Sequence, residues 1–312
     1  MNWIFVTGMI RSGTTLVGKV LSLPWSVGYL HEPFNGGHST RTGSRFEARY
    51  ISHQTENAVR AAYRDHVADI FSLDLKLNIT HHPNYSLPRR IVKKVAGSRG
   101  PVNLAITKLN PLVQFIVLKD PVGKLTTNFL WEEFGAHPVV LVRHPVSLAA
   151  SLDRVGWYPE MLDFTSQPDL VDDFFAEEQE FLNREWPSRL MEAMAHWRAT
   201  YKVLLSQAEE SDDWVVVTHE DISAEPVEVF SGMYEQFGLP WSERIQKRVE
   251  QLTGSRSSPE ARGDQAMDLR RDSSKLFETR RDSVPVETRR EIFDIVKDVA
   301  LKLYTRESFA ID

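Results

Sequence analysis

The sequence has no cysteine in its 312 residues. It therefore offers no disulfide, no thiol nucleophile and no zinc–thiolate site. This absence favours a reducing compartment, so we expect a cytoplasmic protein. No apolar stretch approaches the length of about 18 residues that a membrane span needs, and none is expected. Met1 leads into an apolar run with no basic segment before it, so we expect no signal peptide.

Positive charge is in deficit, because 37 Lys and Arg residues face 43 Asp and Glu residues, for a formal net charge of −6. General binding to nucleic acid or to a membrane surface favours a basic chain, so neither partner is expected. The apolar share of 42% is enough for a sizeable core at this length. We expect a soluble globular protein whose anion sites are local.

Short apolar runs alternate with amphipathic segments along the chain. The runs typical of buried strands are residues 2–6, 25–30, 115–118, 138–142 and 214–217. The segments that favour helices are residues 16–23, 56–71, 145–155, 170–182, 191–205, 227–237 and 286–304. This alternation predicts an α/β fold, with a central parallel sheet covered by helices on both faces. No linker or repeat is evident, so we predict one domain over residues 1–312.

The segment TGMIRSGTT, residues 7–15, lies between the first predicted strand and the first predicted helix. Its Gly8 and Gly13 have the GxxxxG spacing of a P-loop, in which backbone N–H groups at a helix N-terminus hold a phosphate. The lysine that an NTPase needs is absent, because Thr14 follows Gly13, and the fixed positive charge is Arg11 inside the loop. We predict a phosphate site in a P-loop-like, nucleotide-binding fold.

One feature keeps a P-loop kinase or NTPase open as an alternative. The segment FIVLKD, residues 115–120, resembles a buried strand that ends in the acidic magnesium ligand of such enzymes, which would be Asp120. Four apolar residues and an aspartate arise easily by chance. The missing lysine therefore weighs more heavily against this alternative.

A second anion site is predicted where another buried strand ends. Arg143 follows the run at 138–142 directly, and Pro145 then starts a helix. The planar guanidinium of an arginine at such a position suits a phosphate. Ser151 lies eight residues further on, about two turns into the same helix.

Together these segments resemble the PAPS-dependent sulfotransferase family, in its bacterial and carbohydrate-type branch. The motif Lys/Arg-Ser-Gly-Thr-Thr of that family matches residues 11–15, and its strand-end arginine with a serine eight residues later matches Arg143 and Ser151. The segments HEPFN, LKDP, WRATY, VTHEDISAEP and GLPW follow in the family's order. The resemblance is thin over residues 35–110, which we interpret as an acceptor-side insertion.

The resemblance implies the sulfuryl donor 3′-phosphoadenosine 5′-phosphosulfate (PAPS), an acceptor hydroxyl of a carbohydrate or glycoconjugate, and no metal. The residues implied to hold the 5′-phosphosulfate are Arg11, Ser12, Gly13, Thr14, Thr15 and Leu16. Arg143 and Ser151 are implied to hold the 3′-phosphate. The family's late Arg-Lys-Gly segment has no clear copy, and the weak candidates in its place are Arg270, Arg271 and Lys275, in a charged segment at 255–285 that we predict to be a lid.

Catalysis of in-line transfer needs a base near the acceptor hydroxyl. Glu32 is the first candidate, because Pro33 keeps it out of the helical region at a strand end and because the family uses glutamate there. His31 is the second candidate, and we expect only one of these neighbours to face the site. Lys119 ends a strand and either stabilises the leaving oxygen or reaches water. A non-catalytic PAP-binding protein remains a further alternative.

Overall fold

The computed structural model describes residues 1–35, 46–75, 99–254 and 281–312, without the side chains of 99–102. These residues form two compact units. The first unit comprises Met1–Thr7 with Val17–Val139, and the second comprises Gly8–Leu16 with Val140–Asp312. The candidates Arg270, Arg271 and Lys275 lie outside the described residues, as does most of the predicted lid. We describe each unit by itself.

Five strands form the central sheet, in the order β2-β3-β1-β4-β5. Their bounds are β1 (Asn2–Gly8), β2 (Val27–His31), β3 (Phe115–Lys119), β4 (Ala136–Val142) and β5 (Val215–Thr218). β3 pairs in parallel with β1 and with β2, and Lys119 lies opposite both Val6 and His31. The predicted α/β fold with a central parallel sheet is therefore confirmed. The strand predicted at 25–30 begins two residues later than expected.

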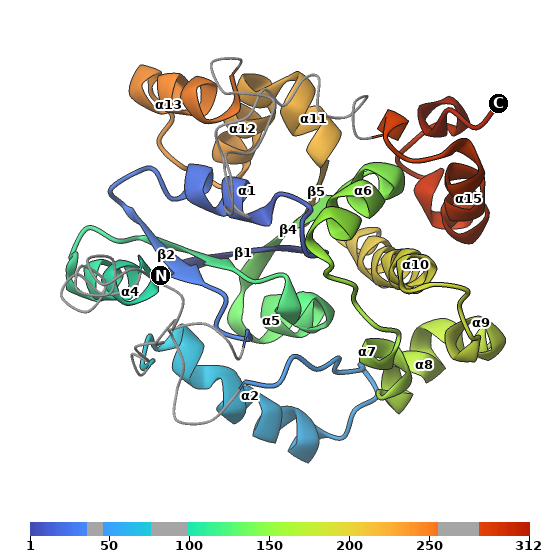
Figure 1. Cartoon of the computed structure of the whole chain (residues 1–312). Coiled ribbons are helices and arrows are strands. Elements are labelled where there is room, and N and C mark those ends of the chain that lie inside the picture. The colour runs from blue at the N-terminus through green and yellow to red at the C-terminus, as the bar shows by residue number, and fades with distance from the viewer. Residues whose placement is uncertain (36–45, 76–98, 255–280) are drawn as a thin grey trace, which may run out of the picture. The chain divides into compact units, whose positions relative to one another are not determined.

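In the first unit, helices cover both faces of the strands (Figure 1). On one face, Trp3 and Phe5 of β1 share a core with α2 (Asn57–Phe71) and α5 (Thr127–Phe134), which follows a 3-10 turn at Val122–Thr126. On the other face, α1 (Thr14–Leu21) approaches closely, because a Cβ on Gly18 would lie 3.1 Å from Cβ of Lys119. The alternating side chains of β1 thus fill two layers, as expected for a buried strand.

The outer edge of the sheet in this unit is closed by α4 (Arg99–Leu109). Thr107 Oγ1 accepts a hydrogen bond of 3.2 Å from Tyr29 N of the edge strand β2. A Cβ on Gly28 would lie 2.4 Å from Thr107 Cγ2, so glycine is needed for this approach. An edge strand covered in this way offers fewer unpaired backbone groups to other chains.

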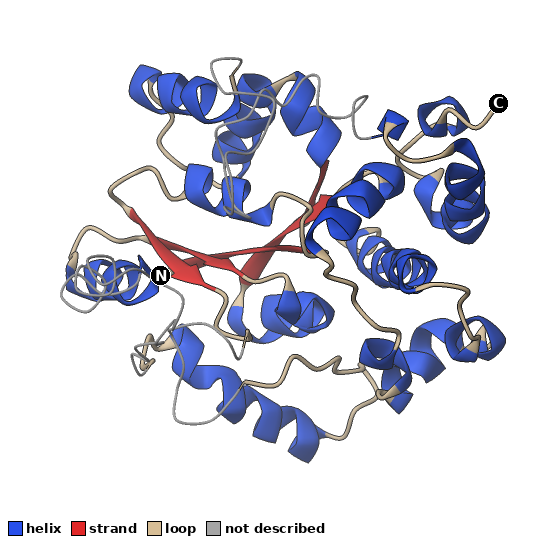
Figure 2. Ribbon diagram, in the orientation of Figure 1, coloured by secondary structure: helices blue, strands red, loops and turns tan. Residues whose placement is uncertain are grey.

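In the second unit, α6 (Pro145–Val155), α10 (Arg189–Ala208) and α15 (Val286–Ala300) pack against one another. A second group contains α11 (His219–Ala224), α12 (Pro226–Gln236) and α13 (Glu243–Thr253) (Figure 2). The remaining short helices are α7 (Leu162–Thr165), α8 (Pro168–Phe175), α9 (Gln179–Asn183) and a 3-10 turn at Arg306–Phe309. The last predicted helix, at 286–304, ends at Ala300.

The single helix predicted at 170–182 is wrong, because the chain breaks it into α8 and α9. Glu178 leaves helical geometry at the break, with φ −121°. Its carboxylate binds Arg198 Nη1 at 2.6 Å and also Lys202 Nζ, both from α10. Apolar periodicity could not predict this break, because the contacts that accompany it come from another helix.

Candidate functional site

The loop after β1 has the backbone of an anion cradle. Gly8 and Gly13 have positive φ values of 138° and 106°, and Arg11 between them has φ 69°. A Cβ on Gly8 would lie 2.3 Å from Leu141 O, so only glycine fits this close approach to β4. A left-handed conformation costs a residue other than glycine about 1–2 kcal/mol, so the structure around Arg11 must hold it there. The loop then enters α1, whose N-terminus favours anions.

Tyr201 of α10 links this loop to the end of β4 through its hydroxyl. Its hydroxyl donates to Leu141 O at 2.6 Å, accepts from Met9 N at 3.1 Å and lies 3.2 Å from Ser12 Oγ. The Tyr201 side chain is fully buried, and burial raises its pKa to about 12. The hydroxyl therefore stays protonated at neutral pH and acts as a fixed link between strand end and loop.

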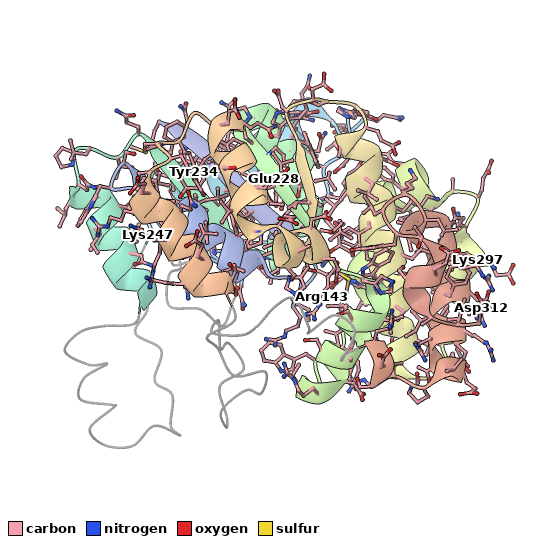
Figure 3. All side chains as sticks on the ribbon, turned by 90° about the horizontal axis from the view of Figure 1, so that it is seen from above. Arg143, Glu228, Tyr234, Lys247, Lys297 and Asp312 are labelled. Atoms are coloured by element: carbon pink, nitrogen blue, oxygen red, sulfur yellow. The ribbon has the colours of Figure 1, made fainter. Side chains whose placement is uncertain are left out.

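The structure brings together three of the predicted phosphate ligands, Arg11, Arg143 and Ser151. Arg11 Nε donates to Ser151 Oγ at 3.4 Å, and Arg143 Nη1 donates to Arg11 O at 2.9 Å. Ser147, one helical turn before Ser151, accepts from Arg143 Nη2 at 3.3 Å. The bond from Arg143 to the Arg11 carbonyl helps to stabilise the left-handed loop residue. Figure 3 shows Arg143 beside the start of α6.

We expected Arg143 to present the N–H donors of its guanidinium to a ligand, but in the structure the residue is buried and partly engaged. The residue is only 3% exposed, and two of its N–H donors bind protein oxygens. Its Nε is buried and has no hydrogen-bond partner within the described residues. Burial lowers the pKa of Arg143 to about 10, while the charge of Glu220 opposes this shift and that of Arg11 adds to it. The guanidinium therefore remains a cation at neutral pH, with a donor to spare.

A separate polar cluster lies in the first unit, at the ends of β2 and β3. Glu32 is 5% exposed and Lys119 is 1% exposed, and Lys119 Nζ contacts Glu32 Oε1. Asn35 Nδ2 donates to the other carboxylate oxygen of Glu32 at 2.8 Å. One interpretation of the sequence expected the Lys119 side chain to reach water, but the structure buries it. Instead it is the buried counter-charge of the candidate base.

The strand alternation that separated His31 from Glu32 as candidate bases does not extend to Glu32. β2 ends at His31, and Glu32 lies beyond it with φ 48°, so the alternation of strand side chains does not reach Glu32. His31 Nε2 lies 3.9 Å from Glu32 Oε1, and Tyr29 Oη lies 2.9 Å from His31 Nδ1. The two candidate bases therefore belong to one cluster.

Asp120 would be the magnesium ligand of the kinase alternative. In the structure its carboxylate accepts hydrogen bonds from backbone N–H groups. Oδ2 accepts from Phe34 N at 2.7 Å, and Oδ1 accepts from Val122 N at 2.8 Å and Gly123 N at 3.2 Å. Burial, and then the charge of Glu32, raise the pKa of Asp120 to about 7. These bonds fix the segment after β2 next to the segment after β3. Within the described ranges, no group of three or more His, Asp or Glu side chains is assembled to bind a metal.

A comparison with protein families decides what kind of protein carries these clusters. The family model described as "Sulfotransferase family" matches residues 3–243. The chain belongs to the sulfotransferase family. The resemblance that the sequence motifs predicted is thus confirmed at the level of the family.

Solved structures of other sulfotransferases have a similar course of the chain. The sulfotransferase domain of the curacin biosynthetic pathway is 15% identical, with a TM-score of 0.47 over 96% of this chain and 97% of that chain. The domain of the Synechococcus PCC 7002 olefin synthase is 15% identical, with a TM-score of 0.48 over 96% and 94%. A mouse sulfotransferase in complex with PAP is 12% identical, with a TM-score of 0.43 over 99% and 88%. No curated protein sequence matches this sulfotransferase.

Sequence reasoning missed several residues that organise the candidate site. The helix at 191–205 was interpreted only as core, yet it supplies Tyr201 to the loop and Trp197, whose Nε1 donates to Arg143 O at 2.9 Å. Ser147 could have been found as the residue one turn before Ser151 on the same helix face. No helix in the part of the chain that the structure describes is long and apolar enough to span a membrane.

Proposed function

We propose that this sulfotransferase moves a sulfuryl group from PAPS to an acceptor hydroxyl. The observation that carries the proposal is the cluster of Arg11, Arg143 and Ser151 at a glycine-containing loop. Two guanidinium groups that lie together repel each other. The charge of Arg11 accordingly helps to lower the pKa of Arg143. A bound polyanion relieves this repulsion, and a donor with phosphates at both its 5′ and 3′ positions suits two arginines.

The proposed donor site divides its work between the loop and α6. The loop N–H groups, Arg11, Thr14 and Thr15 bind the 5′-phosphosulfate, with Ser12, Gly13 and Leu16 shaping the turn. Arg143 and Ser151 bind the 3′-phosphate, which distinguishes PAPS from ATP. The unpartnered Nε of Arg143 supports this fit, since a buried N–H without an acceptor costs about 1–3 kcal/mol. PAPS supplies the activated sulfuryl group, and the residues supply position and positive charge.

A thermal-shift series tests the donor directly. We expect PAP to raise the melting temperature clearly, AMP to raise it less, and ATP with magnesium to have little effect, because stabilisation follows binding to the folded state. Stabilisation by ATP with magnesium but not by PAP would favour the kinase alternative and end the PAPS proposal. The engagement of both Asp120 oxygens by backbone N–H groups already argues against that alternative.

We propose Glu32 as the base that takes the proton of the acceptor hydroxyl. Its support is structural: the Glu32 carboxylate is buried just beyond the end of β2 and contacts the buried Lys119, which can hold it in one orientation. Lys119 holds the carboxylate, and we propose that it also faces the negative charge that grows on oxygen during transfer. His31 remains the alternative base, because its ring lies within 3.9 Å of the same carboxylate.

The acceptor class is proposed as a carbohydrate or glycoconjugate hydroxyl, on the Glu-Pro element of the HEPFN segment alone. A panel of glycans and small alcohols, offered with labelled PAPS, would identify it. Transfer to simple alcohols but to no glycan would remove this part of the proposal. A cytoplasmic location, one domain and a lid at 255–285 stay predictions.

Tyr201→Phe tests whether donor binding needs the hydrogen bonds that the Tyr201 hydroxyl makes to the loop. We expect the Kd for PAP to rise about tenfold, because the loss of bonds to Met9 N and Ser12 Oγ is worth about 1–1.5 kcal/mol. Isothermal titration calorimetry measures this change. Tyr234→Phe, at another buried tyrosine on α12, is the control and should leave the Kd unchanged. Equal weakening in both variants would mean that buried tyrosine hydroxyls act only on general stability.

A further inference from the structure

A carboxylate lies near Arg143 without forming an ion pair with it. Glu220, on α11, influences the pKa of Arg143 and is influenced by it in return. No salt bridge within 4.0 Å joins the two groups, although both lie in the same buried region. Arg143 Nε and Glu220 Oε1 are both buried, and neither has a hydrogen-bond partner among the residues that the structure describes. Such a pair would normally combine.

Two donors hold the other oxygen of this carboxylate. Glu220 Oε2 accepts from Tyr304 Oη at 2.9 Å and from His144 N at 3.2 Å. His144 directly follows Arg143, so this bond anchors the strand end that carries the guanidinium. Burial raises the pKa of Glu220, while Arg143 and the two donors oppose that shift. Tyr304 therefore decides much of where the carboxylate lies.

Tyr304 itself is well anchored by the C-terminal segment. Its ring lies 4.8 Å from the His144 ring, and the Phe309 ring lies 4.4 Å from His144 on the same segment. Ser308 Oγ is 3.0 Å from His144 Nε2. Residues 304–309 thus form a fixed support over the end of β4.

The consequence concerns phosphate binding. A carboxylate that paired directly with Arg143 would occupy the donors that a phosphate needs and would repel the phosphate as well. A carboxylate held a short distance away still helps to keep the guanidinium charged but leaves Nε open. In this arrangement the acidic side chain stabilises the charge of Arg143 without competing with a phosphate for its donors.

We propose that Tyr304 is a positioning residue that holds the Glu220 carboxylate away from Arg143, so that Arg143 stays available to a 3′-phosphate. The inference rests on the proposed PAPS function and deepens it, because it identifies what sets discrimination for the 3′-phosphate. In Tyr304→Phe the carboxylate loses its nearer donor and turns to Arg143 Nε, where it competes with the ligand.

The experiment is a double-mutant cycle that compares PAP with AMP, which lacks the 3′-phosphate. Calorimetry gives the ratio of the AMP Kd to the PAP Kd for the wild type, Tyr304→Phe, Glu220→Gln and the double variant. We expect Tyr304→Phe to lower this ratio at least tenfold through weaker PAP binding. Glu220→Gln should keep the ratio, and the double variant should recover it to within about threefold, because a neutral amide competes poorly for the guanidinium.

A matched control removes the same kind of bond elsewhere. Tyr158 Oη donates to Asp153 Oδ1 at 2.6 Å on the protein surface, so Tyr158→Phe should leave the ratio unchanged. An unchanged ratio in Tyr304→Phe would overturn the inference. So would a double variant as weak as Tyr304→Phe, which would assign Tyr304 a purely structural role. A wild type that binds AMP and PAP equally would instead refute the proposed function, and the inference with it.

Discussion

Replacing Glu32 by glutamine is expected to lower kcat by about 100- to 10,000-fold, the usual range for the loss of a general base. Glutamine has nearly the same shape, and its one amide oxygen can still accept from Lys119 Nζ, although the amide NH2 then takes the place of the oxygen that accepts from Asn35 Nδ2. It cannot take a proton from the acceptor hydroxyl. The Kd for PAP should therefore stay within about threefold of the wild type, since a base acts on the chemical step rather than on donor binding. Single-turnover transfer from labelled PAPS measures the effect.

The lysine left behind needs its own control. Removing one partner of a buried ion pair costs about 3–5 kcal/mol, because the other charge stays buried without a counter-charge. Glu32→Gln combined with Lys119→Met removes both charges, so it should restore stability but not turnover. Asp65→Asn on the exposed side of α2 should change neither. Normal turnover in Glu32→Gln together with its loss in His31→Gln would transfer the role of base to His31.

Replacing Arg143 by alanine is expected to raise the Kd for PAP about 100-fold or more, since truncating one partner of a buried, hydrogen-bonded charge pair costs about 2–5 kcal/mol. The affinity for AMP should change far less, because AMP has no 3′-phosphate. The loss should also loosen the loop, as Arg143 Nη1 no longer supports the Arg11 carbonyl. Calorimetry with the two nucleotides separates these contributions.

Arg143→Lys keeps the positive charge but not the planar guanidinium. It provides a second test of the same residue if the alanine variant folds poorly. We expect it to weaken PAP by about tenfold, between the wild type and alanine, because a lysine binds phosphate as a point charge. Arg154→Ala, at an exposed arginine of α6, the helix that follows Arg143, is the control for simple loss of positive charge. An equal loss of PAP and AMP affinity in Arg143→Ala would remove this residue from 3′-phosphate recognition.

Much of the candidate donor site could be predicted from local patterns. Gly8 and Gly13 bracket Arg11 at a fixed spacing, and the backbone φ values agree with the turn that this spacing predicted. Arg143 and Ser151 are eight residues apart across a proline-started helix, and helical geometry brings both to Arg11. The turn and these contacts could be anticipated because they depend on short-range spacing and on strands whose ends share one edge of the sheet, while the binding of a donor by these residues stays a prediction.

Predictions that depended on distant residues held less well. Glu32 and Lys119 were both candidates, but the sequence contained no sign that they would contact each other, since 87 residues separate them. Asp120 would have been the magnesium ligand of the less favoured kinase alternative, whereas three backbone N–H groups donate to its carboxylate. The alternation rule failed at Glu32 because the strand ends one residue earlier. In the first two cases a contact across the fold decided the outcome, and in the third the end of the strand did.

The sequence by itself determined the α/β class, the glycine-bracketed turn after the first strand, the arginine at the end of a later strand and the family to which the chain belongs. These follow from hydrophobic periodicity, glycine spacing and short motifs, all of which act within a few residues. Only the tertiary structure decided that Tyr201 holds the loop, that Lys119 pairs with Glu32 and that Tyr304 donates a hydrogen bond to Glu220. Side-chain hydrogen bonds in a buried interior depend on which surfaces meet, and that is settled only when the whole chain has packed.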